Sequence, residues 1–83
     1  MSEQTPANTP MLEKVISTIE RVGNISGLKP DQDMSTAGFS SIRTLELLLE
    51  LEEQFAVAIP DDGRFPAART AQEIHALVEA LRS

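Results

Sequence analysis

Cysteine is absent from the 83 residues, and histidine occurs once. The lack of cysteine excludes disulfide bonds, thiolate metal sites and a cysteine nucleophile, and one histidine excludes any site built from two. Cations are also few, because seven Lys and Arg stand against 13 Asp and Glu, for a formal net charge of −6. Nucleic-acid binders need cations to displace counterions from phosphates, so direct binding of DNA or RNA is not expected.

Long apolar runs are missing as well. No stretch approaches the roughly 18 residues that a membrane span needs, and residues 1–10 lack the basic and apolar regions of a signal peptide. We therefore expect a cytoplasmic protein with no membrane association. The length allows one domain, and 41% hydrophobic residues suffice for a core. We expect a monomer with a flexible tail over residues 1–8 and one folded domain over residues 9–83.

Apolar residues recur at helical spacing in the first half of the chain. The first such segment runs from a start signal at Thr9–Pro10, with Thr9 as cap, to a stop signal at Gly23–Asn24. A second helix is predicted to begin with Ser40 or Ser41 as its cap and to end near Phe55. Between the two helices lies a loop of unusual length for a compact domain.

The second half begins with a predicted turn at Asp61–Gly63 and a short helical turn over 64–68. Thr70 and Glu73 then have the spacing of a capping box, which opens a last helix with one apolar face. The only alternating segment, residues 55–59, is too short to build a sheet. The pattern predicts an all-α fold: a small up-down bundle of three main helices plus a short extra helix, with a long first loop.

The long loop, residues 23–40, carries apolar residues that can fasten it to a core. They are Ile25, Leu28, Met34 and Phe39. We expect the loop to be ordered but comparatively mobile.

The second predicted helix has one apolar face more than a small bundle can bury. Its core-facing side carries Leu47, Leu48, Leu51 and Phe55. The opposite side carries an apolar stripe formed by Ile42, Leu45 and Leu49. An acidic rim formed by Glu46, Glu50 and Glu53 lies among and beside the stripe. An exposed stripe of this kind would have the anatomy of a docking surface. The alternative is that the loop 23–40 folds over the stripe and buries it.

Other candidate sites carry little chemistry. His75 has no identifiable nucleophile or pocket and is interpreted as a boundary residue loosely paired with Glu79. Asp31–Asp33 begins like a calcium loop, but Thr36 and Ile42 occupy the positions that need glycine and a bidentate acid. Catalysis by this chain alone is not expected.

The serine pair Ser40–Ser41 follows Gly38 and Phe39 at the start of the second helix. On spacing alone, the pair is most simply a helix cap. The alternative is a modification site, because a phosphate on a serine there would be stabilised by the helix dipole and free backbone N–H groups. The adjacent stripe would then be where enzymes hold the modified protein.

Four segments around this pair resemble the acyl carrier protein family. They read GFSSI at 38–42, LEL at 45–47, LEEQF at 51–55 and IPD at 59–61. The family core reads roughly G-x-D-S-L, then V-E-L, L-E-E-x-F and I-P-D, in the same order. The resemblance covers about residues 11–82, and the helix order, the long first loop and the acidic balance agree with it.

This resemblance implies a cofactor and a role. Ser41 matches the serine that receives 4′-phosphopantetheine from coenzyme A, added by a phosphopantetheinyl transferase. The arm ends in a thiol that carries an acyl or aminoacyl group as a thioester. Ile42, Leu45 and Leu49 match positions that contact partner enzymes in the family, and the resemblance thus favours an exposed stripe.

Two residues depart from the pattern of fatty-acid carriers. Ser40 stands where those carriers usually have Asp, and Arg43 replaces a common acid. Both changes remove negative charge beside Ser41, which favours a dedicated biosynthetic pathway, with a loading ligase and downstream enzymes as further partners. Two alternatives stay open: an aminoacyl or peptidyl carrier, and a helical adaptor that binds a partner through the second helix without a prosthetic group.

Overall fold

The computed structural model describes residues 9–82, apart from the side chain of Thr9. The predicted tail over residues 1–8, Ser83 and the cap assigned to Thr9 lie outside what it describes. The described range forms four α-helices, one 3₁₀ helix and no strand, as the all-α prediction requires. In chain order the elements are α1 (Thr9–Gly23), η1 (Ser41–Arg43), α2 (Thr44–Phe55), α3 (Arg64–Ala67) and α4 (Ala71–Arg82).

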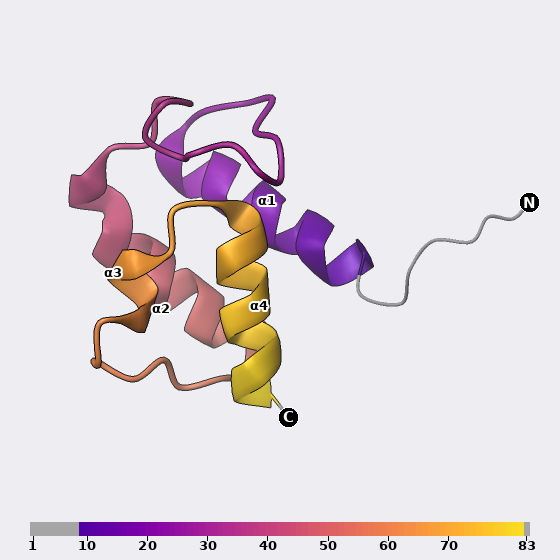
Figure 1. Ribbon diagram of the computed structural model, residues 1–83, viewed down its shortest axis with the longest axis vertical. Coiled ribbons are helices and arrows are strands. Elements are labelled where there is room, and N and C mark those ends of the chain that lie inside the picture. Colours follow the sequence, from indigo (N-terminus) through magenta and orange to yellow (C-terminus); the bar gives the residue numbers. More distant parts are fainter. Residues whose placement is uncertain (1–8, 83) are drawn as a thin grey trace, which may run out of the picture.

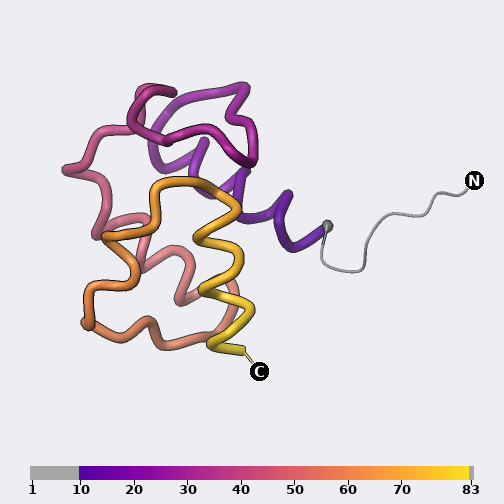
Figure 2. Tube along the Cα trace, viewed as in Figure 1, coloured from indigo at the N-terminus to yellow at the C-terminus, as the bar shows by residue number. Residues whose placement is uncertain are grey.

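Helix α1 packs against both α2 and α4, while the short α3 packs against α4 (Figure 1). The chain in Figure 2 shows α1 running towards the long loop, and α2 and α4 both running back away from it. The predicted bundle of three main helices and one short helix is confirmed. None of the helices in the described range combines the length and apolarity that crossing a membrane requires.

The core lies where the three long helices meet. Its most deeply buried apolar side chains are Val15 and Ile19 from α1, Leu47 and Leu51 from α2, and Ile74 and Val78 from α4. These pairs are separated by four residues, so each pair lies on one face of its helix. The buried hydroxyl of Thr18 hydrogen-bonds with the side chain of Gln54, and thereby joins α1 to α2 without leaving that polar group unsatisfied.

The start of α4 follows the predicted capping box. The backbone N–H of Glu73 donates to Thr70 Oγ1 at 3.1 Å, and the N–H of Thr70 donates to Glu73 Oε1 at 3.2 Å. The predicted turn before α3 is also confirmed, because Asp62 Oδ1 accepts the N–H of Arg64, the first residue of that helix, at 3.2 Å. Local side-chain chemistry therefore fixes both helix starts.

The loop between α1 and η1 is fastened at several points to the rest of the protein. Leu28, Met34 and Phe39 are all buried. The N–H of Met34 donates to the carbonyl of Arg69 at 2.9 Å, and the carbonyl of Pro30 accepts the N–H of Gln72 at 3.0 Å. The predicted attachment of the loop to the core is thus confirmed, and its order and comparative mobility stay predictions.

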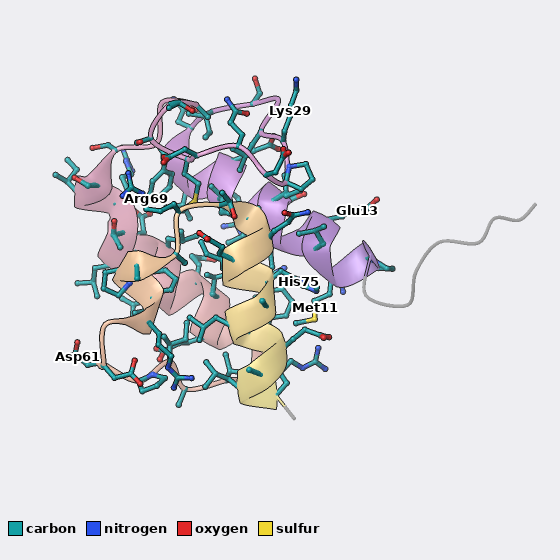
Figure 3. The ribbon with its side chains drawn as sticks, in the orientation of Figure 1. Met11, Glu13, Lys29, Asp61, Arg69 and His75 are labelled. Atoms are coloured by element: carbon teal, nitrogen blue, oxygen red, sulfur yellow. The ribbon has the colours of Figure 1, made fainter. Side chains whose placement is uncertain are left out.

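His75 is more buried than the sequence indicated. Figure 3 shows it on α4, where it is only 8% exposed, and its Nε2 atom has no hydrogen-bond partner among the described residues. The prediction of a boundary position was wrong because α4 is covered from two sides: α1 packs along it, and the loop reaches it at Gln72. The pairing with Glu79 stays a prediction.

The close approach of Phe39 to Gly23 gives a test of the packing. A Cβ atom at Gly23 would overlap the ring of Phe39. Replacing a helical glycine by alanine normally stabilises by about 1 kcal/mol, whereas overpacking costs about 1–3 kcal/mol. We expect Gly23→Ala to lower the free energy of unfolding by roughly 1 kcal/mol, measured by urea denaturation. In the background of Phe39→Leu the loss should shrink, and a Gly23→Ala variant more stable than the parent would contradict this packing.

Candidate functional site

Ser41 is the first residue of η1 and is exposed to solvent. The segment before it is held in place because Phe39 is buried and its N–H donates to the carbonyl of Met34 at 3.0 Å. Gly38 has φ 102°, a backbone conformation that favours glycine, and this turns the chain immediately before Phe39. A buried anchor two residues upstream thus fixes the position of a hydroxyl that itself faces solvent.

The predicted serine cap is only partly right. Ser40 does occupy the N-cap position of η1, with extended dihedral angles, but its side chain makes no capping hydrogen bond. Its carbonyl instead accepts the N–H of Arg43 at 3.0 Å and closes a single 3₁₀ turn. Regular α-helix starts only at Thr44, so the expected α-helical start at the serine pair was wrong by one turn.

A cavity of about 420 Å³ opens beside Ser41. Its lining comes from the loop, η1, α2, α3, the linker before α4, and α4 itself. The apolar part of the lining comprises Met34, Phe39, Leu47, Phe65 and Ile74. Pro66, Ala68, Thr44 and Ser41 complete the wall, and Asp33, Ser35 and Arg69 add polar groups. An exposed hydroxyl therefore borders a largely apolar hollow.

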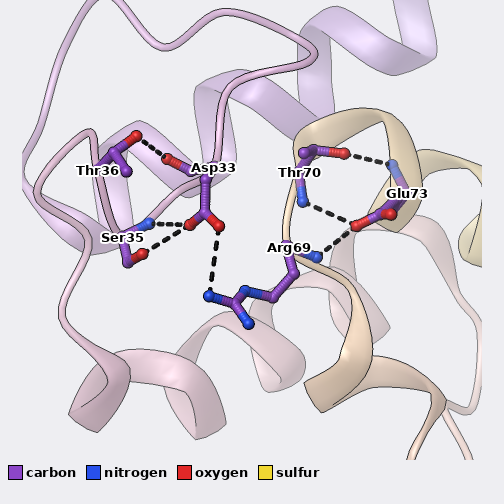
Figure 4. Close-up of polar contacts among 6 residues, drawn as sticks. All are labelled: Asp33, Ser35, Thr36, Arg69, Thr70 and Glu73. Atoms are coloured by element: carbon purple, nitrogen blue, oxygen red, sulfur yellow. Dashed lines mark hydrogen bonds and ion pairs between the residues drawn. The ribbon is translucent and has the colours of Figure 1, made fainter.

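Asp33 and Arg69 join the loop to the linker before α4 at this cavity (Figure 4). Arg69 Nη2 lies 3.3 Å from Asp33 Oδ2, and both the N–H and the hydroxyl of Ser35 donate to Asp33 Oδ1, at 2.9 and 2.6 Å. The hydroxyl of Ser35 is the main reason that the pKa of Asp33 lies below its ordinary value of 3.8, with its N–H and the charge of Arg69 contributing in the same direction. The contacts of this carboxylate stabilise the conformation of the loop.

The apolar stripe on the outer side of η1 and α2 is exposed. Ile42 is 87% exposed, Leu45 66% and Leu49 54%, whereas Leu47 and Leu51 on the other side are at most 1% exposed. The alternative that the loop covers the stripe was therefore wrong: the loop packs against α1 and the linker before α4 instead. The stripe begins one residue after Ser41, so the serine and the stripe form one continuous surface.

The acidic rim carries less unpaired charge than its composition indicates. Arg43 Nη1 lies 3.4 Å from Glu46 Oε1, and Arg21 Nη1, from α1, lies 3.2 Å from Glu50 Oε1. Glu53 is exposed and takes part in no ion pair in the described part of the chain. The sequence predicted that these three carboxylates lie near the stripe. It did not indicate that Arg21 would pair with Glu50, which lies 29 positions further along the chain.

Other chemistry is sparse around the serine. Within residues 9–82 no cluster of three or more metal-ligating side chains exists. The cavity and the Asp33–Arg69 ion pair were not predicted from the sequence, because both depend on how the loop meets a linker more than 30 positions further along the chain. The nearest signal was the set of apolar residues in the loop, which indicated attachment to a core without showing where.

Comparison with known families finds a match over most of the chain. The family model of the phosphopantetheine attachment site matches residues 12–78. No curated protein matches the chain.

The two faces of α2 can be tested with one pair of variants. Leu45→Glu should change the free energy of unfolding by at most about 0.5 kcal/mol, because Leu45 is mostly exposed. Leu51→Glu should be severe, because it places an unpaired charge in the core. Thermal unfolding followed by circular dichroism measures both, and equal melting temperatures would refute the assignment of faces.

The origin of the low pKa of Asp33 is testable by carbon-detected NMR titration of its carboxyl group. Ser35→Ala should raise this pKa more than Arg69→Ala, since the Ser35 hydroxyl is the largest cause of the shift. Because folding lowers the pKa of Asp33, its ionised carboxylate stabilises the folded state at pH values above the unfolded pKa of 3.8. This stabilisation is lost as the pH falls through the lower pKa of the folded state. The attachment of the loop should therefore be insensitive to pH above about 5. If Arg69→Ala raises the pKa of Asp33 more than Ser35→Ala does, the Ser35 hydroxyl is not the main cause of the shift.

Proposed function

The chain belongs to the family of phosphopantetheine attachment domains, and we propose that it is a discrete carrier protein whose attachment residue is Ser41. The carrier role and the covalent 4′-phosphopantetheine cofactor follow from membership of the family. The choice of Ser41 rests on its position: an exposed hydroxyl at the junction of an exposed apolar stripe and an apolar cavity. Ser40, its neighbour, is exposed too but does not line the cavity.

The residues around Ser41 fit such a group. The hydroxyl is accessible from solvent, so an enzyme can reach it without unfolding the helix. The largely apolar cavity beside it offers room for part of a flexible chain. When bound, the cofactor supplies a terminal thiol on which an acyl or aminoacyl group is carried as a thioester, chemistry that the cysteine-free chain lacks.

Attachment of 4′-phosphopantetheine requires little chemistry from this chain. A phosphopantetheinyl transferase would supply the base that takes the hydroxyl proton of Ser41. The serine oxygen would bond to the phosphorus that carries the pantetheine group in coenzyme A, and adenosine bisphosphate would leave. The chain contributes a fixed, accessible oxygen, held by the buried Phe39 two residues before it. No residue of the chain is assigned a catalytic role.

The partner-docking surface in this proposal is built on η1 and α2. Its centre is the stripe of Ile42, Leu45 and Leu49, and its margin comprises Ser40, Arg43, Glu46, Glu50 and Glu53. Exposed apolar side chains surrounded by polar ones are the usual composition of a protein interface. The transferase, a loading ligase and the downstream enzymes would use this surface in turn.

The margin favours a dedicated pathway over general fatty-acid synthesis. Ser40 and Arg43 stand beside Ser41 where the resemblance to fatty-acid carriers leads one to expect acids. Arg43 also places a cation in the first turn, near the positive end of the helix dipole. An acyl group is the first choice of cargo, and an aminoacyl or peptidyl group is the alternative within the same chemistry.

Intact mass provides the decisive measurement. Co-expression with a broad-specificity phosphopantetheinyl transferase should increase the mass of the parent by one 4′-phosphopantetheine group, and Ser41→Ala should abolish the increase. The fold should be unaffected, because Ser41 is exposed and no capping hydrogen bond is lost.

Ser40→Ala is the matched control, since it removes a neighbouring hydroxyl that is exposed and caps nothing. It should be modified like the parent. Modification of Ser41→Ala would show that Ser41 is the wrong residue, and an unmodified parent would favour the adaptor alternative, in which the stripe binds a partner and no arm is attached.

A further inference from the structure

Among the described residues, a single cation lines the cavity beside Ser41. This cation is Arg69, and every other Lys and Arg of the described range lies outside the lining. Asp33 is the one acidic residue among the described lining residues, and the rest of the wall is uncharged. A guanidinium therefore shares this hollow with the hydroxyl to which the proposed function assigns the arm.

The guanidinium of Arg69 is held less firmly than the other ion-paired arginines of the described range. Arg21, Arg43 and Arg64 each donate a well-aligned hydrogen bond to their carboxylate. Arg69 Nη2 lies 3.3 Å from Asp33 Oδ2 without such a hydrogen bond, and its side chain is 64% exposed. Figure 4 shows this side chain extending from the linker towards Asp33. The N–H donors of the guanidinium thus remain available to a second anion.

Asp33 does not depend on Arg69 for its main contacts. Its Oδ1 atom accepts the N–H and the hydroxyl of Ser35, at 2.9 and 2.6 Å. These two hydrogen bonds lower the pKa of Asp33 more than the charge of Arg69 does. The loop itself is joined to the linker through the backbone, because the N–H of Met34 donates to the carbonyl of Arg69. The Arg69 side chain can therefore turn to another anion without releasing the loop.

Attachment of the arm brings such an anion to the cavity. The group that joins 4′-phosphopantetheine to a serine is a phosphodiester, which carries one negative charge on the phosphorus bonded directly to the serine oxygen. In a chain of net charge −6, this charge is favoured where a cation lies within reach. The planar guanidinium of arginine matches the spacing of two phosphate oxygens and binds them more strongly than a neutral donor does.

From this arrangement we propose that Arg69 binds the phosphodiester of the arm on Ser41 and so fixes the direction in which the arm leaves the serine. The proposal rests on the proposed carrier function. Arg43 is nearer to Ser41 in the sequence, but its Nη1 donates to Glu46 at 3.4 Å and it does not line the cavity. Arg69 is a positioning residue in this proposal and takes no part in the chemistry of the thiol.

The test compares the melting temperature of each protein before and after modification with coenzyme A and a broad-specificity transferase. The comparison within one variant cancels any effect that the substitution has on the unmodified fold. Modification should be less favourable for the melting temperature of Arg69→Gln than for that of the parent, by about 3 °C or more. The difference should shrink at about 1 M salt, because the charges are then screened. Arg64→Gln is the matched control, since Arg64 has one ion pair, is 51% exposed and does not line the cavity.

A second measurement needs no substitution and therefore does not depend on the stability of Arg69→Gln. In NMR spectra of the parent, exchange of the Arg69 guanidinium protons with water should slow about threefold or more on modification, while exchange at Arg64 should not change.

Two results would overturn the proposal. One is an effect of modification on the melting temperature that is equal in the parent and in Arg69→Gln, or that depends more on Arg43→Gln. The other is unchanged exchange at Arg69. Intact mass separates this inference from the proposed function. A parent that never gains the mass of the arm refutes the carrier role, whereas a modified parent without any dependence on Arg69 refutes this inference alone.

Discussion

Helix α2 can bury only one of its two apolar faces, and the arrangement of the functional surface depends on this constraint. Leu47 and Leu51 belong to the core, in which α2 packs against α1, and they lose nearly all contact with water there. Residues on the opposite side of a helix then necessarily face outward. Leu45 and Leu49 occupy this outward side of α2, and Ile42 of the preceding η1 extends it. Burial on one side therefore holds the exposed stripe rigidly, on a regular element rather than on a flexible loop.

The position of Ser41 depends on the same packing in a second way. The loop that delivers the serine is anchored by Phe39, which fits against Gly23 only because that residue has no side chain. The backbone then passes from a buried aromatic ring to an exposed hydroxyl within two residues. The other attachments of the loop, at Met34 and Pro30, lead to the linker and to the start of α4. Cavity, serine and stripe are thus parts of one rigid arrangement.

Sequence reasoning succeeded where the determining interaction is local. The capping box of Thr70 and Glu73 acts across three positions, and the two faces of α2 follow from helical geometry alone. It failed where the structure depends on contacts between segments that are far apart in the sequence. The burial of His75 requires both α1 and the loop to cover α4. The 3₁₀ turn at Ser41 depends on the backbone position that the buried Phe39 sets two residues earlier. The capping propensity of serine does not predict this position.

The exposed stripe also sets the strength of the complexes that this surface can form. Full burial of an exposed Leu or Ile side chain contributes about 1.5–3 kcal/mol. Because the three residues of the stripe are between 54% and 87% exposed, they supply roughly 3–6 kcal/mol when a partner covers them. Association costs about 4–15 kcal/mol in lost translational and rotational freedom. The two quantities are of similar size. Complexes formed through the stripe alone must therefore be weak and short-lived. Rapid release is what a carrier needs if one surface is to serve several enzymes in succession, because a tightly bound first partner would exclude the next.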